Sequence, residues 1–267
     1  MPLKEAIEQK KVVVHETKAV NELAIENISS DVDVFVQGGD VVKGGQQDRV
    51  FTTDLILPPK SGRTPVATFC VEQGRWTKRG SEEVRTFNSS TEIVAHKELK
   101  RAVKGGKDQS KVWDEVAKAN LAVGLASSSY QLNVESKQMT QKLDGYLKAL
   151  QPLLVKSPDA VGFVYAVNGK FAGGEVYSNP ALFNALWTKT SKAAAVEASG
   201  EAVDGKAPAF GVADARQSLV AFKADAKAEN PNKRTKTAKG ESPKVLMFES
   251  SDTAVRDGWL HRSYVAK

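Results

Sequence analysis

Short runs in which apolar and polar residues alternate dominate the first ninety residues. Leu23 and Ile25 are separated by a single residue, and similar alternation recurs over residues 31–36. A period of two is typical of half-buried β-strands. Residues 51–59 and 64–72 add two apolar runs, and the prolines and glycine between them predict a turn that joins them as a strand pair. Short strands at this spacing predict a small antiparallel sandwich or barrel.

The period changes to that of helices after the first ninety residues. Residues 93–106 have helical spacing and end at a glycine pair, which suits a helix C-terminus. Asp108 is placed to cap the next helix, whose apolar residues recur on one face over residues 112–123. A third amphipathic helix covers residues 139–151, and we expect Pro152 to end it.

Strand patterns return in residues 161–177, interrupted by Asn168-Gly169. This dipeptide between apolar runs predicts a two-residue hairpin, because a type I′ turn needs positive φ at both positions. Asn179 and Pro180 then suit the start of a helix, the first as its cap and the second in its first turn.

The remaining pattern completes a mixed architecture. The order of strands, helices, hairpin, helices and strands lacks the regular alternation of a doubly wound fold, so it predicts an α+β protein. We expect a β-rich, sandwich or barrel-like half over residues 1–90, a mixed helix and β-hairpin half over residues 91–267, and one continuous folding unit. The other expected elements are helices up to about Ser199 and over residues 212–226, a loop over 227–244, and closing strands over 244–250 and 258–266.

Composition limits the chemistry that the chain can perform. Cys70 is the one cysteine among 267 residues, which rules out an internal disulfide and a multi-cysteine zinc site. The three histidines, His15, His96 and His261, are too few for a histidine-rich site, and we expect no bound metal. No apolar run is long enough to cross a membrane, and the N-terminal segment lacks a signal-peptide core. We expect a cytoplasmic protein; the alternative is an exported protein whose signal peptide has been removed.

The formal net charge of +6 is concentrated in two segments. Residues 97–111 and 227–244 each hold six basic and two acidic side chains. Such segments are compatible with a polyanion partner, whereas the other interpretation is a solvated helix face and a solvated loop. Residues 230–244 contain no aromatic side chain on which a base could stack. We therefore favour solvated surfaces and do not expect nucleic-acid binding.

Polar side chains interrupt the apolar strands of residues 37–59 and 69–76. The glycines there match neither a phosphate-binding loop nor a dinucleotide fingerprint, so they favour tight hairpins. We expect ion pairs between Arg49 and Glu72 and between Asp48 and Arg75. One interpretation is a buried ion-pair network beside a core tryptophan. The other is a rim that holds a small anionic or planar ligand, since arginine binds phosphate or carboxylate and tryptophan offers a stacking face. The candidate ligand-binding residues are Gln47, Asp48, Arg49, Glu72, Arg75 and Trp76.

Three other residues have side chains that could take part in catalysis. Cys70 has no base nearby in the sequence, so an inert thiol is favoured over a nucleophile. His261 lies in the last expected strand, where a structural role is favoured over a functional one. Glu175 is the carboxylate of the expected hairpin, and the sequence gives no reason to pair it with Glu72 for acid–base catalysis. Catalytic residues and cofactors therefore stay unidentified.

Several segments together resemble a known family. GGDVVKGGQQDRV, LILPP and FCVEQGRW occur in this order, and the 161–177 hairpin and LHRSYV follow. Over residues 12–266 the chain is similar to the ARG-and-Rhodanese-Phosphatase-superfamily-associated protein domain, an uncharacterised bacterial family. Residues 226–244 do not follow its pattern. The family's name records an association with ADP-ribosylglycohydrolases and rhodanese-phosphatase proteins, which implies an ADP-ribose-like or other phosphorylated ligand. The positions that match its strongest motifs are Gly44, Gly45, Gln47, Asp48, Arg49, Cys70, Glu72, Gly74, Arg75 and Trp76.

These observations favour a non-catalytic module that binds a small phosphorylated ligand or a protein partner, with a link to ADP-ribose or nucleotide-sugar metabolism. The first alternative is a hydrolase of nucleotide-sugars or phosphoesters, in which Glu72 or Asp48 is the general base and Arg49 or Arg75 stabilises developing negative charge. The second is a structural protein that self-assembles through strand edges or basic segments.

Overall fold

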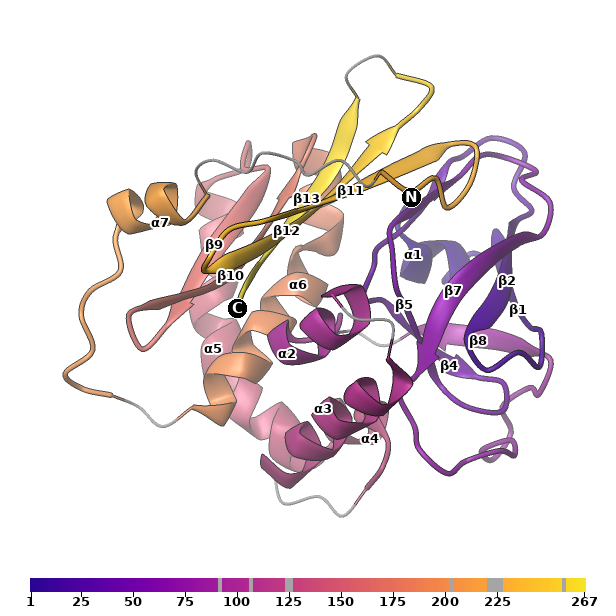
Figure 1. Ribbon diagram of the computed structural model, residues 1–267, viewed down its shortest axis with the longest axis horizontal. Coiled ribbons are helices and arrows are strands. Elements are labelled where there is room, and N and C mark those ends of the chain that lie inside the picture. Colours follow the sequence, from indigo (N-terminus) through magenta and orange to yellow (C-terminus); the bar gives the residue numbers. More distant parts are fainter. Residues whose placement is uncertain (91–92, 106–107, 123–126, 202–203, 220–227, 256–257) are drawn as a thin grey trace.

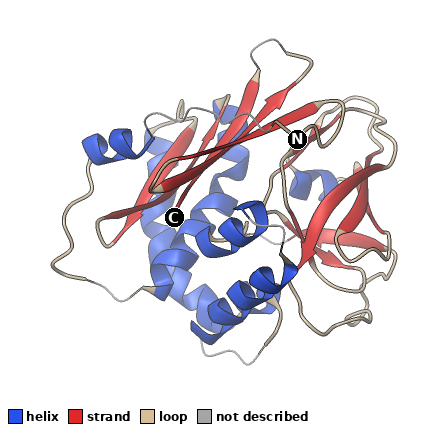
Figure 2. Cartoon of the chain, viewed as in Figure 1, coloured by secondary structure: helices blue, strands red, loops and turns tan. Residues whose placement is uncertain are grey.

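The computed structural model describes residues 1–90, 93–105, 108–122, 127–201, 204–219, 228–255 and 258–267. A small β-barrel occupies one side of the molecule, and a second sheet with its helices occupies the other (Figure 1). Figure 2 shows helices behind the second sheet and between this sheet and the barrel. The prediction of an α+β protein is therefore confirmed. No helix in the described ranges is long and apolar enough to cross a membrane.

The barrel is closed by antiparallel pairing around its whole circumference. Its strand order is β1-β2-β7-β5-β4-β8, and β8 returns to β1 with Val14 opposite Phe87. Leu23 and Ile25 are fully buried, as their alternation predicts, so one face of β2 packs inside the barrel. The closed barrel thus settles the sandwich-or-barrel alternative. The strands are β1 (Val12–Glu16), β2 (Glu22–Asn27), β4 (Val41–Gly44), β5 (Arg49–Phe51), β7 (Thr64–Cys70) and β8 (Thr86–Ser90).

A short two-stranded sheet and a short helix adjoin the barrel. The sheet pairs β3 (Val34–Val36) with β6 (Leu55–Leu57), and the helix is α1 (Leu3–Glu8). The expected pairing of residues 51–59 with 64–72 holds only at the start of the first run, where Phe51 lies opposite Thr68. The rest is wrong, because the turn after β6 redirects the chain, so that β6 pairs with β3 and β7 pairs with β2 and β5. All three residues of β3 are buried, so half-buried alternation over 31–36 is also wrong. Phe35 and Ile56 pack against side chains of the second half, which covers the outer face of this sheet.

The other helices lie behind the second sheet or between this sheet and the barrel, and the last of them lies at the outer edge of the molecule (Figure 1). They are α2 (Lys97–Lys100), which continues as the π-helical turn η1 (Arg101–Gly105), α3 (Gln109–Ala122), α4 (Tyr130–Val134), α5 (Lys137–Lys156), α6 (Pro180–Gly200) and α7 (Val212–Leu219). The Asp108 carboxylate accepts a hydrogen bond from the Ser110 backbone N–H, as expected of a cap. Val123 of the expected α3 face and the second half of the expected 212–226 helix lie outside the described residues.

Pro152 does not end its helix, which is a further correction. Helix α5 continues to Lys156 with Pro152 inside it. A proline in a helix interior removes one hydrogen bond to the carbonyl four residues earlier. Here that carbonyl belongs to Lys148, and both residues are exposed, so water can satisfy the carbonyl. The proline is therefore tolerated on the solvent side of the helix.

The second sheet has five antiparallel strands in the order β11-β12-β13-β10-β9. The expected hairpin is confirmed, because Asn168 and Gly169 have φ of 48° and 72° between β9 and β10. The Asn179 cap is also confirmed, since its side chain accepts from the Leu182 backbone N–H at 2.8 Å. The strands are β9 (Gly162–Val167), β10 (Lys170–Tyr177), β11 (Thr235–Glu241), β12 (Val245–Asp252) and β13 (Trp259–Ala266).

The basic segment 227–244 is not simply a loop, contrary to expectation. Strand β11 lies inside it and pairs along its length with β12, from Thr235 opposite Asp252 to Glu241 opposite Leu246. It is an edge strand, where exposed lysines are common because they discourage pairing with other chains. Its charged composition is therefore compatible with a strand at this position.

Candidate functional site

The residues predicted to bind a ligand lie where β4, β5 and β7 meet, and they form an ion-pair network. Arg75 donates from Nε to Glu72 at 2.6 Å and from Nη2 to Asp48 at 3.2 Å. The expected pair between Asp48 and Arg75 is thus confirmed. Arg79, which the sequence did not single out, also lies 3.1 Å from Asp48 and 3.4 Å from Glu72. Two arginines therefore cover both carboxylates.

Arg49 bonds to other partners than the expected Glu72. Its guanidinium donates to the side-chain oxygen of Gln47 at 3.0 Å and to Cys70 Sγ at 2.8 Å. It also lies 3.8 Å from the carboxylate of Glu16. Neighbouring residues along a strand point to opposite faces, so Arg49 turns away from the side on which Arg75 and Glu72 meet. The expected pairing of Arg49 with Glu72 is wrong for that reason.

Cys70 is a buried thiol held in this second group. Burial raises its pKa, and the positive charge of Arg49 opposes this effect only in part. The protonated thiol is a poor nucleophile, since the thiolate is the reactive form. The expectation of an inert cysteine fits this environment.

Burial also determines the electrostatics of Asp48. Burial and the neighbouring carboxylate of Glu72 raise its pKa to about 6, against the opposing effect of Arg79. Asp48 has no exposed surface and Glu72 is 5% exposed. A general base must come within hydrogen-bonding distance of its substrate. With both carboxylates covered by arginines, this geometry does not favour a hydrolase that uses either of them.

Trp76 is the most accessible of the predicted site residues. Its side chain is 51% exposed, so it is not the core tryptophan of the ion-pair interpretation. The six predicted residues, Gln47, Asp48, Arg49, Glu72, Arg75 and Trp76, lie in one region of the structure. All but Arg75 and Trp76 are buried. The assignment of the six residues to ligand binding stays a prediction.

A second buried group of charges joins the two halves through His261. Its Nδ1 lies 2.7 Å from Asp54, between β5 and β6, and its Nε2 lies 2.7 Å from Glu175 of β10. Lys100 of α2 bonds Glu175, and Lys104 lies 3.6 Å from Asp54. We call these five residues the seam cluster. Because Asp54 belongs to the first half and the other four to the second, the cluster ties the barrel to the second sheet.

Opposite charges in the seam cluster outweigh the cost of burying them. Against the effect of burial, Lys100 and His261 lower the pKa of Glu175 to about 2. Lys104 and His261 likewise hold the pKa of Asp54 far below its usual range. The two carboxylates raise the pKa of His261, which is fully buried. A ring with a carboxylate at each nitrogen donates from both and is an imidazolium. The structural interpretation of His261 fits this arrangement.

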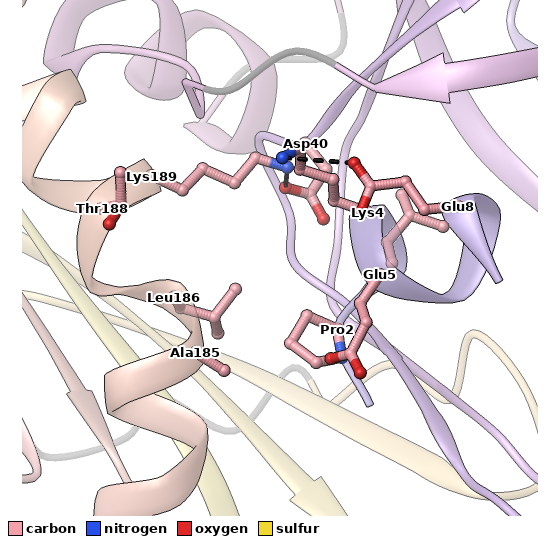
Figure 3. A pocket seen from close by; sticks show the side chains of 10 residues that line it. Pro2, Lys4, Glu5, Glu8, Asp40, Ala185, Leu186, Thr188 and Lys189 are labelled. Atoms are coloured by element: carbon pink, nitrogen blue, oxygen red, sulfur yellow. Dashed lines mark ion pairs between the residues drawn. The ribbon is translucent and has the colours of Figure 1, made fainter.

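An open pocket of about 290 Å³ lies between α1 and α6, and we call it the seam pocket. Figure 3 shows Lys4 of α1 and Lys189 of α6 reaching from opposite sides toward the same end of this pocket. Lys189 pairs with the buried Asp40 at 2.5 Å, and Lys4 pairs with Glu8 at 3.3 Å. The seam pocket is thus built from both halves and has two ammonium groups at one end.

A second pocket of about 380 Å³ adjoins the seam pocket along α6. The two share Pro2 and Ala185 as lining residues. The side chains of Phe35 and Ile56 contribute an apolar wall to the second pocket. The two pockets therefore offer one ligand an end with two lysines and an end where this apolar wall lies beside the carboxylates of Asp33 and Asp252.

A comparison with models of known protein families identifies the family of this chain. The family model of the ARG and Rhodanese-Phosphatase-superfamily-associated Protein domain matches residues 1–265. The chain belongs to this family. The barrel, the seam cluster and the seam pocket all lie within the family domain, as does the basic segment 227–244 that the sequence set apart. Neither the curated proteins nor the solved structures give a match.

Within this family domain, the first basic segment is less exposed than expected. Lys100 and Lys104 point inward to the seam cluster, so a fully solvated helix face over 97–111 is wrong. Their spacing of four residues along α2 and η1 was the available signal, since it puts both on one helical face. The structure also gives a reason for the glycine at position 38, because a Cβ there would lie 3.1 Å from the Lys104 ammonium. No group of histidines, cysteines and carboxylates suited to a metal occurs among the described residues.

Proposed function

We propose that the protein is a non-catalytic binding module that holds a small anionic ligand in the seam pocket. The observation that carries this proposal is the approach of two lysines, Lys4 and Lys189, to one end of an open pocket. Ammonium groups bind phosphate and carboxylate as point charges. The ligand's anionic group would lie at this end of the pocket.

The two lysines share this lining with three carboxylates, those of Glu5, Glu8 and Asp40, so an anionic ligand has to displace a carboxylate. Lys4 and Glu8 form a surface pair whose side chains are 38% and 61% exposed, and such pairs contribute little stability. A ligand phosphate would take the place of Glu8 beside Lys4. The ion pair between Lys189 and Asp40 is buried, and we expect it to persist beneath the bound ligand.

The size and lining of the pockets favour a ligand with an apolar or ring-containing part. The seam pocket alone is small for a drug-sized ligand, for which pockets hold about 300–1,000 Å³. The adjoining pocket adds about 380 Å³ and the apolar wall of Phe35 and Ile56. The family's association with ADP-ribosylglycohydrolases supports ADP-ribose as the first ligand to test, and its adenosine part would lie along the apolar wall.

Binding is tested by thermal denaturation of the full chain with ADP-ribose, NAD and sugar phosphates. A ligand at one hundred times its dissociation constant adds about 2.7 kcal/mol to the free energy of unfolding. Ala185→Trp fills the space shared by both pockets and should remove the stabilisation. Asn184→Trp is the matched control, because Asn184 is exposed on the same helix but lines neither pocket. Stabilisation that survives Ala185→Trp would contradict the proposal.

The same screen tests the region predicted from sequence. Trp76→Ala removes an exposed stacking face without touching the buried ion pairs. Binding lost in Trp76→Ala and retained in Ala185→Trp would assign the ligand to the Arg75 and Trp76 surface. Release of phosphate or ribose from any bound compound would show that the module is an enzyme.

A further inference from the structure

Strand β9 forms one edge of the second sheet, and the proposed function does not use it. Within the described ranges, β10 lies on one side of it and no strand lies on the other. The backbone of Val161 faces β10, because its carbonyl accepts from the Tyr177 N–H at 2.7 Å. Backbone groups alternate in direction along an antiparallel strand. Those of Gly162, Val164 and Ala166 therefore point away from β10, and no described residue pairs with them. We call these three residues the β9 edge.

The two edges of this sheet are protected to different degrees. Along β11, Lys236 and Lys239 discourage pairing with another chain, and the backbone of Thr237 already pairs with that of Glu229, at 2.8 and 2.9 Å. Strand β9 has the sequence GFVYAV, which contains neither a charged residue nor a proline, and all of its residues are partly exposed. An uncharged, apolar edge strand favours pairing with a further strand. The β9 edge therefore has the character of an interface.

We propose that the β9 edge pairs with the same edge of a second copy of the chain, in an antiparallel dimer with a twofold axis at Val164. Gly162 then pairs with Ala166 of the partner subunit, and the two second sheets become one continuous sheet. Under twofold symmetry, a charge at the centre of the strand would face its own copy and repel it. Strand β9 has no such charge, so its sequence is compatible with pairing to itself.

The two ends of the paired strands carry opposite charges. Asp159, in the turn before β9, lies as far before the axis as Gly169 lies after it, so it comes beside the hairpin tip of the partner subunit. Lys170 directly follows Gly169 at this tip. Asp159 and Lys170 are both exposed, and neither has an ion-pair partner among the described residues. The loop that contacts the tip adds one acidic and one basic residue, Asp204 and Lys206, so the tip keeps a net positive charge. The dimer thus places an attractive pair of charges at each end.

Apolar side chains near the edge extend this interface beyond the strand. Leu154 of α5 and Phe163 of β9 pack against the same apolar cluster, so the end of α5 adjoins β9. On either side of Leu154, Leu153 and Val155 are 50% and 82% exposed. One strand alone makes a small interface, and apolar contacts beside it supply additional area. The seam pocket and its neighbour are lined by other elements, so the dimer does not depend on what they bind.

Sedimentation velocity of the full chain over a range of concentrations tests this dimer. The wild type should sediment as a dimer that dissociates on dilution. Val164→Lys places two lysines opposite each other at the axis and should be monomeric, because like charges directly opposite are destabilising. Ala238→Lys is the matched control, since it adds the same charge to β11 at the other edge and should leave the dimer intact. Melting temperatures show whether both variants fold.

Charge reversal at the exposed Asp159 and Lys170 tests the same interface without changing β9. Asp159→Lys and Lys170→Glu should each weaken dimerisation about tenfold. An equimolar mixture of these two variants should recover the wild-type affinity, because their heterodimer has opposite charges at both ends. The proposal is overturned by a wild type that is monomeric at every concentration, by a folded Val164→Lys variant that stays dimeric, or by a mixture that associates no more tightly than the single variants.

Discussion

The imidazole of His261 lies 2.7 Å from the carboxylate of Asp54, although 207 residues separate the two along the chain. Asp54 also accepts hydrogen bonds from the Ser250 hydroxyl at 2.7 Å and from the Gly38 backbone N–H at 2.7 Å. A carboxylate with this many partners is held in one position, and its partners come from the loop after β3 and from β12 and β13. The barrel and the second sheet are therefore joined by a charged contact rather than by apolar packing alone.

His261→Gln should destabilise the protein strongly. Removing one member of a buried ion pair leaves an uncompensated charge, which costs about 3–5 kcal/mol. Urea denaturation measures this loss. Arg262→Ala is the control in the same strand, because Arg262 and Glu249 form a partly exposed pair whose loss should cost no more than about 1 kcal/mol. Equal effects of the two variants would contradict the role assigned to the seam cluster.

The contribution of His261 should depend on pH. Its folded pKa is raised above the unfolded value of about 6.5, so protonation favours the folded state. The stabilisation is fully present below about pH 6.5 and is lost as the pH rises through the folded pKa. The difference in free energy of unfolding between wild type and His261→Gln should therefore shrink between pH 6 and pH 9. A difference that grows over this range would show that the neutral ring is favoured.

Asp48 should give a pH dependence in a lower window. Its pKa is about 6 in the folded protein against 3.8 as the reference, so folding favours the protonated carboxyl. This contribution is complete below about pH 3.8 and is lost as the pH rises through about 6. When the pH is lowered from 7 to 5, the free energy of unfolding of the wild type should rise by about 1 kcal/mol relative to that of Asp48→Asn. Parallel profiles for the two proteins would mean that the arginines keep Asp48 ionised.

Arg75→Ala tests whether the network around Asp48 is structural. The substitution removes one of two arginines from a pair of buried carboxylates, so a loss of about 1–3 kcal/mol is expected in urea denaturation. Arg63→Ala is the control, because Arg63 is 69% exposed and lies 3.9 Å from Glu26. Unchanged stability together with lost ligand binding would instead support the ligand-binding role predicted from sequence.

Two glycine substitutions should act in opposite directions. Gly169→Ala should destabilise by more than about 1 kcal/mol, because φ is +72° there and an added Cβ would meet the Pro208 carbonyl. Gly145→Ala lies inside α5 with nothing near the added Cβ and should stabilise by about 0.5–1 kcal/mol. Melting temperatures of the two variants check both signs.

Local chemistry predicts the local parts of this fold well. The Asn168-Gly169 turn and the Asn179 cap depend on residues adjacent in the chain, and both are as predicted. Pairing between distant segments is different. The turn after β6 was visible in the sequence, but nothing in it shows that β6 pairs with β3 rather than with β7.

The candidate site shows the same division. The ion pair of Asp48 with Arg75 joins two neighbouring segments and could be predicted. The seam cluster could not, because Asp54, Glu175 and His261 come from three distant strands or loops, and each alone has an unremarkable context. The seam pocket depends in turn on how α1 and α6 approach each other, which no local pattern determines.

The seam cluster also has a consequence for how the protein is made. A ribosome completes the barrel segment long before it synthesises β13, so Asp54 first emerges without His261 or Ser250. During that interval the carboxylate must stay hydrated, and Phe35 and Ile56 lack their cover. The two-stranded sheet beside the nascent barrel therefore keeps its outer face exposed to water, and final docking of the two halves should wait for the last strand to leave the exit tunnel.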